Sequence, residues 1–136
     1  MPAAGGTEEE LTREGGTAPF ESLDGGTLYF LRKTTGALLA RPTAGGQERT
    51  IVGCVDGWNY AVAPRGLFYL DCSTQDGTTA SQWILRYRDA ATEQDRPAAT
   101  LEADWIGGLS ASPDGRGLVY GHTVWTSELM MIENFR

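Results

Sequence analysis

The sequence is poor in the residues that most often carry out chemistry. It has one histidine, two cysteines and, against 18 acidic residues, only 11 lysines and arginines in 136 residues. A metal site at His122 would need histidine, cysteine or carboxylate partners at ligand spacing, and none recurs around it. Gly-x-Ser-x-Gly, P-loop and dinucleotide-binding motifs are missing, and a Ser-His-Asp triad would have to use this one histidine. We therefore predict a protein that is not an enzyme and has no catalytic residues, metal or cofactor.

Basic clusters and long apolar runs are also missing. The formal net charge is −7, so we predict no nucleic-acid partner. No apolar run approaches the ~20 residues that a membrane helix needs, and residues 1–10 carry no charged-then-apolar leader. The sequence predicts a soluble protein without a membrane partner or a signal peptide. It leaves the compartment open: the chain as it stands would be cytoplasmic, and a fragment of a longer protein could also be periplasmic.

The two cysteines are 18 residues apart, a spacing that fits neither a CxxC redox pair nor a zinc site. We expect Cys54 and Cys72 to be buried as small hydrophobic side chains. A disulfide between them is the alternative, because the sequence does not tell how close their Cα atoms lie.

Glycine is abundant, and the chain repeats itself. Its 18 glycines lie among short apolar runs, which favours short strands joined by tight turns. Residues 1–8 recur as residues 41–48, and the same offset of 40 aligns 28–30 with 68–70. A period of 40–50 residues is the length of one four-stranded β-propeller blade.

Related turns mark the same place in different repeats. Ser112-Pro113-Asp114-Gly115 precedes an apolar strand just as Ser22-Leu23-Asp24-Gly25 does. Asp24 and Asp114 could be paired as acid and base, but their turn role explains both, because an Asp side chain bonds the backbone two residues on.

The repeat predicts an all-β fold that is half of a β-propeller in one domain, residues 1–136. Residues 17–55 are one four-stranded antiparallel blade and residues 56–104 a second. Residues 105–136 are an incomplete, three-stranded blade, and residues 1–16 contain an orphan outer strand. The predicted strands lie at 7–13, 18–22, 27–32, 37–41, 48–55, 58–63, 67–72, 82–88, 98–103, 108–112, 118–122 and 128–133.

The turn at 112–115, together with residues 128–135, resembles the TolB-like six-bladed β-propeller superfamily, whose repeat carries Ser-Pro-Asp-Gly between its two inner strands. The resemblance covers essentially the whole chain and implies the C-terminal half of such a propeller. Similar bacterial propellers stand behind other domains, including winged-helix regulators and peptidases, and in TolB itself the propeller docks partner proteins. The partner-binding residues of the family cannot be placed on this sequence.

Half a ring leaves strand edges unpaired, and such edges invite pairing with another chain. Two copies related by a two-fold axis would close a six-bladed ring. In this homodimer, residues 7–13 of each copy would pair with strand 128–133 of the other and complete its last blade. The alternative is a fragment that pairs with further blades of a longer protein.

Aromatic residues gather where the inner strands begin. Trp58, Asn59 and Tyr60 open the inner strand of the second blade, and Phe20 and Glu21 lie at the matching place in the first. The starts of inner strands line the mouth of a propeller channel, so we predict that these five residues bind a protein or small-molecule ligand. Ordinary packing between blades is the competing interpretation.

Trp125 lies in a predicted turn, and we expect it to be exposed as a contact surface. The sequence therefore predicts a non-catalytic binding and assembly module. The alternative is the propeller part of a longer bacterial enzyme or transcriptional regulator, acting as a sensor or gate.

Overall fold

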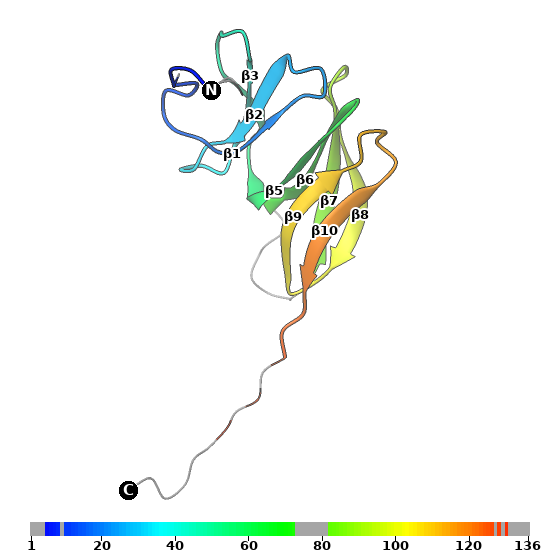
Figure 1. Cartoon of the computed structure of the whole chain (residues 1–136). Helices are drawn as coiled ribbons and strands as arrows, with labels where there is room; N and C mark the ends of the chain where they lie inside the picture. The colour runs from blue at the N-terminus through cyan, green and yellow to red at the C-terminus, as the bar shows by residue number, and fades with distance from the viewer. Residues whose placement is uncertain (1–4, 9, 73–81, 127, 129, 131–136) are drawn as a thin grey trace, which may run out of the picture.

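The computed structural model describes residues 5–8, 10–72, 82–126, 128 and 130. Within these residues the fold is all-β, with ten strands in three antiparallel sheets (Figure 1). The first sheet has the strand order β1-β2-β3-β4, the second β5-β6-β7-β8, and the third pairs β9 with β10. The bounds are β1 (Thr17–Glu21), β2 (Thr27–Leu31), β3 (Leu38–Pro42), β4 (Arg49–Val52), β5 (Val55–Ala63), β6 (Gly66–Asp71), β7 (Gln82–Asp89), β8 (Asp95–Glu102), β9 (Trp105–Ala111) and β10 (Leu118–Thr123).

The ten strands correspond to ten of the twelve predicted ones, with ends shifted by up to three residues. The predicted strand at 7–13 is not formed in the single chain, because residues 7, 8 and 10–13 lie in no strand. The strand expected at 128–133 lies largely outside the described residues, and Glu128 and Met130 are not in a strand. The fold of the single chain therefore does not test whether residues 7–13 of one copy pair with residues 128–133 of another.

The turns at 22–25 and 112–115 have the same construction. In each, the serine hydroxyl donates to Oδ1 of the aspartate two residues on at 2.5 Å. The same Oδ1 accepts a backbone N–H at 3.0 Å, and the closing glycine has a φ of +71°. A left-handed φ of this kind suits glycine because it has no Cβ. The repeat seen in the sequence is thus a repeat of hydrogen bonds.

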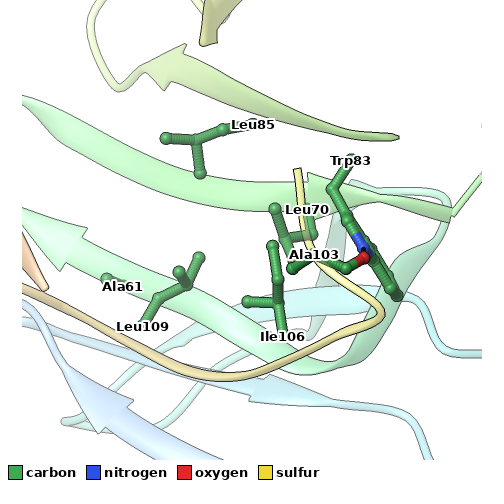
Figure 2. Packing of buried hydrophobic residues seen from close by; sticks show 7 residues of the cluster. All are labelled: Ala61, Leu70, Trp83, Leu85, Ala103, Ile106 and Leu109. Atoms are coloured by element: carbon green, nitrogen blue, oxygen red, sulfur yellow. Dashed lines mark hydrogen bonds between the residues drawn. The ribbon is translucent and has the colours of Figure 1, made fainter. Parts of the chain in front are cut away.

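Two hydrophobic clusters join the three sheets. One cluster lies between the second and third sheets, and its buried residues are drawn in Figure 2. Within it the Trp83 indole N–H donates to the Ala103 carbonyl at 2.8 Å, so the buried polar group has a partner. The other cluster lies between the first and second sheets and includes Leu38, Tyr60 and Tyr69. The second sheet therefore packs on both of its faces.

The prediction of two unpaired cysteines is wrong in this structure. Cys54 and Cys72 form a disulfide, with their Cα atoms 5.8 Å apart. The reason is the register of β5 and β6, in which Val55 is paired with Asp71. The two cysteines are the next residues beyond that pair, and their separation lies in the range that a disulfide spans.

Candidate binding site at the inner-strand bulges

Each of the three sheets presents one edge strand toward its neighbour. These inner strands are β1, β5 and β9, and neighbouring ones are in contact. Each has an irregularity in its pairing near its start, and each contains a residue with positive φ there. The residues are Ala18 (φ 50°), Gly57 (φ 55°) and Gly108 (φ 74°). Bulges of this kind bend a strand and redirect its side chains, and they occur often beside functional sites.

Asn59 and Tyr60 join the second sheet to the bulges of both neighbours. The Tyr60 hydroxyl donates to the carbonyl of Ala18 in the first sheet. The Asn59 amide donates to the Ile106 carbonyl at 3.0 Å and accepts from the Gly108 N–H at 2.7 Å. Both side chains are buried, and burial raises the pKa of Tyr60. They thus connect the sheets, as the competing interpretation expected, and their direct part in ligand binding stays a prediction.

The other three predicted site residues are exposed. The side chains of Phe20 and Trp58 are 45% and 70% exposed, and Glu21 is exposed as well. Phe20 packs edge-to-face on Tyr60, with ring centroids 5.3 Å apart. Because the Tyr60 hydroxyl is bonded to Ala18, the support beneath Phe20 is fixed. The structure therefore brings Phe20 and Tyr60 into direct contact.

Sequence reasoning missed Trp105, the first residue of β9, which is 52% exposed. Its ring lies over Gly107, where an added Cβ would be 2.0 Å from Trp105 Cη2. Only glycine at position 107 leaves room for this orientation of the indole. With Trp105 included, each inner strand carries one exposed aromatic residue near its bulge. The signal was available in the sequence, three residues before the strand expected at 108–112.

Asp56 is a second residue that sequence reasoning missed. It is the second residue of β5, next to the positive-φ Gly57, and its side chain is half-buried. Burial raises the pKa of Asp56, and a hydrogen bond from the Asn59 amide at 3.4 Å acts in the opposite direction. Asp56 and Glu21, the last residue of β1, carry carboxyl groups on the same inner strands as Trp58 and Phe20. Such a set suits a cationic group, which is attracted both by aromatic faces and by carboxylates.

The remaining predictions concern residues away from these bulges. Trp125 is 72% exposed, as expected, and its backbone N–H donates to Asp104 Oδ2 at 2.6 Å. In the part of the chain that the structure describes, no group of three or more His, Cys, Asp or Glu residues is placed to hold a metal ion. The same residues contain no helix long and apolar enough to cross a membrane. Neither the protein-family models nor the curated proteins give a match to this chain.

Proposed function

We propose that the chain is a non-catalytic β-propeller module in which each sheet is one blade, and that it binds a cationic group of a partner at the inner-strand bulges. The observation that carries this proposal is the repetition of a positive-φ bulge with an exposed aromatic residue on β1, β5 and β9. Repetition across three blades is expected of a channel mouth, whereas a single exposed ring would need no explanation.

The chemistry of the site gives the class of ligand. Phe20, Trp58 and Trp105 offer aromatic faces, and Glu21 and Asp56 offer negative charge. A lysine or arginine side chain can use both kinds of contact, and each cation–π contact contributes about 0.5–1 kcal/mol at an exposed position. We therefore expect a basic segment of a protein partner rather than an acidic or purely apolar ligand.

A short lysine-rich peptide tests the binding proposal, with a glutamate-rich peptide of the same length as its counterpart. Binding is measured by titration calorimetry and by the change in tryptophan fluorescence. We expect Trp58→Ala and Trp105→Ala each to weaken binding about fivefold, and Leu23→Ala, at an exposed residue of the turn after β1, to leave it unchanged. Unchanged binding in both tryptophan variants would mean that the overall negative charge alone attracts the peptide and would contradict the site. Equal losses in all three variants would contradict it as well.

We also propose that two copies assemble into the six-bladed ring, with residues 7–13 of each completing the last blade of the other. Gly5 and Gly6 support this proposal, because their φ values of 88° and 158° resemble those of Gly45 and Gly46, at 97° and 140°. Gly45 and Gly46 lie between β3 and β4 and lead into the outer strand of the first sheet. Gly5 and Gly6 thus have nearly the turn geometry that precedes an outer strand.

The third sheet provides the other half of this assembly. Leu109 of β9 is buried against the second sheet, so its neighbour Ser110 points to the opposite face, together with its cross-strand partner Val119. Val119 is 72% exposed, and β10 has no described strand along its second edge. An exposed apolar face beside an open edge favours association with a further strand and blade.

A charge placed on this face tests the assembly. We expect Val119→Asp to convert the associated form to a monomer without changing its far-ultraviolet circular dichroism. Val124→Asp, a similarly exposed valine just beyond β10, is the matched control and should leave association unchanged. Association that survives Val119→Asp would mean that the third sheet is not the interface.

A further inference from the structure

A second site lies at the opposite end of the inner strands, away from the bulges. It is a cavity of about 220 Å³ between the second and third sheets. The turn after β5 lines one side of it, β6, β7 and β8 form its floor, and the turn at 112–115 closes the other side. An added Cβ at Gly115 would lie 3.2 Å from Pro64 Cδ, so the two turns are in close contact at its rim.

Aromatic rings form the floor of the cavity. Phe68 and Tyr87 are cross-strand partners on β6 and β7, with ring centroids 4.9 Å apart. Arg96 is in turn the cross-strand partner of Tyr87, and its guanidinium lies 5.0 Å from the centroid of that ring. Stacking on the ring holds the guanidinium plane, while the N–H groups at its edge remain able to donate to a carboxylate.

The cavity contains two arginines that have no carboxylate within salt-bridge distance among the described residues, Arg65 and Arg96. The neighbouring Arg88 takes up the nearby acids, with Asp95 at 2.5 Å and Glu93 at 3.9 Å. Arg65 contributes to lowering the pKa of Asp89, but that carboxylate already accepts hydrogen bonds from the backbone at 91 and 92. In an acidic protein, two such arginines in one cavity indicate an anionic ligand group.

Asp114 brings one negative charge to the same cavity. Hydrogen bonds from the Ser112 hydroxyl and the Arg116 backbone lower the pKa of Asp114, so it is charged at neutral pH. Both bonds go to Oδ1, and Oδ2 takes part in neither. A simple anion would meet the repulsion of this carboxylate, and a simple cation would meet that of the two arginines.

We propose that this cavity binds a small zwitterion with an apolar body, the chemical class of a free α-amino acid. The ligand carboxylate pairs with Arg65 and Arg96, its ammonium group faces Asp114, and its apolar body rests on Phe68 and Tyr87. The site is formed within one chain, so it does not depend on assembly into a ring or on binding at the inner-strand bulges.

Titration of the full chain with L-phenylalanine tests the proposal, followed by calorimetry or by backbone amide shifts in NMR spectra. Benzoate, which has only the carboxylate, and phenethylamine, which has only the ammonium group, serve as comparison ligands. We expect phenylalanine to bind at least tenfold more tightly than either, with the largest shifts at residues around the cavity. Absence of phenylalanine binding, or benzoate that binds as tightly, overturns the proposal.

Variants separate the cavity from the turn that borders it. We expect Arg96→Gln and Asp114→Asn each to weaken phenylalanine binding about tenfold. Asp24→Asn makes the same change in the equivalent turn of the first sheet, which does not line this cavity, and should leave binding unchanged. Arg96 is an exposed strand residue, so its variant remains informative even if Asp114→Asn does not fold. An equal loss in Asp24→Asn, or no loss in Arg96→Gln, contradicts the site.

Discussion

The outer faces of the first and third sheets differ in what covers them. Leu28, Phe30 and Leu39 of the first sheet are buried, and the segment before β1 lies against this face. Gly16 lies so close to Phe30 that an added Cβ would be 2.7 Å from Phe30 Cδ2. On the third sheet the corresponding face, with Val119 and Trp105, is open. In the single chain, the segment before β1 thus covers one end of the stack of sheets, and the other end is open. In the proposed ring, the partner's third sheet would have to take the place of that segment on the first sheet.

An ionic contact holds the covering segment in place. Arg32, just after β2, pairs with Glu48, just before β4, at 2.5 Å and with Glu14 of the segment at 3.3 Å. Its guanidinium also lies 5.9 Å from the Phe30 ring centroid. The third sheet has no equivalent cover among the described residues. The two faces therefore make different contributions to stability, although both belong to edge sheets of the same repeat.

The largest expected effect on stability comes from the covered outer face of the first sheet. Phe30→Ala removes a buried ring and should lower the free energy of unfolding by about 3–5 kcal/mol. Val119→Ala on the open face should change the stability of the isolated chain by less than about 0.5 kcal/mol. Urea denaturation followed by circular dichroism measures both. Similar losses in the two variants would mean that the two faces are equally covered in solution.

Loss of the Cys54–Cys72 disulfide should have the next largest effect on stability. The bond lies on the side of the second sheet that is near the first sheet. The residues that it joins are 18 apart, and a loop of this size is expected to stabilise the fold by roughly 3 kcal/mol. Addition of a reductant should therefore lower the denaturation midpoint of the native chain. The double variant Cys54→Ser, Cys72→Ser should show the lower midpoint without responding to reductant. Two freely alkylated thiols in the untreated protein would show that the bond does not form.

Loss of the hydrogen bonds of Asn59 should lower stability by a smaller amount. These bonds join the second sheet to the third. Asn59→Ala leaves the Gly108 N–H and the Ile106 carbonyl without their partner, which should cost about 2 kcal/mol. Tyr60→Phe removes the bond to the first sheet and should cost about 1 kcal/mol. Hydrogen exchange at Gly108 should speed up in the first variant and remain slow in the second. If Tyr60→Phe alone accelerates it, the two junctions are not independent.

The smallest effect depends on pH at Asp56. Burial raises the pKa of Asp56 in the folded state, so folding favours its protonated form. Stability from this group is therefore present at low pH and is lost as pH rises from its ordinary value of 3.8 through the raised value. Because the side chain is partly exposed, the loss should stay below about 1 kcal/mol. Asp56→Asn should remove it.

Asp24 and Asp114 should change stability with pH in the opposite direction to Asp56, so they serve as internal controls. Hydrogen bonds from Ser22 and Ser112 lower the pKa of each, so their contribution is present above the ordinary value of 3.8 and is lost as pH falls through the lowered one. Denaturation of Asp56→Asn and Asp24→Asn across pH 3–7 separates the two cases. A stability difference between native chain and Asp56→Asn that does not grow with pH would contradict the assignment.

The sequence was informative where the structure is local and repetitive. The Asp-Gly turns fix where β1 and β9 end, because the serine, aspartate and glycine of each turn bond one another. The Cys54–Cys72 bond was not predictable with the same means, because it depends on the register of β5 against β6. Trp105 was missed because β9 begins three residues before the regular part of the repeat, on the far side of its bulge.

The two candidate sites also differ in how far the sequence could predict them. Phe20 and Trp58 could be selected from the sequence because each is an aromatic residue in the inner strand of a repeat. The Arg96–Tyr87 stack and the approach of Asp114 require three strands and two turns from different repeats to meet. No spacing in the sequence indicates that these strands and turns come into contact. The proposed assembly of two copies is harder still to predict from the sequence, because it would involve surfaces of two chains.

The mass of the native chain in solution, measured by light scattering across a range of concentrations, tests the central claim most directly. A ring closed by two copies predicts a stable species of twice the 14.7 kDa chain mass, lost on deletion of residues 1–13. A species that stays at 14.7 kDa at every concentration would contradict the proposed ring.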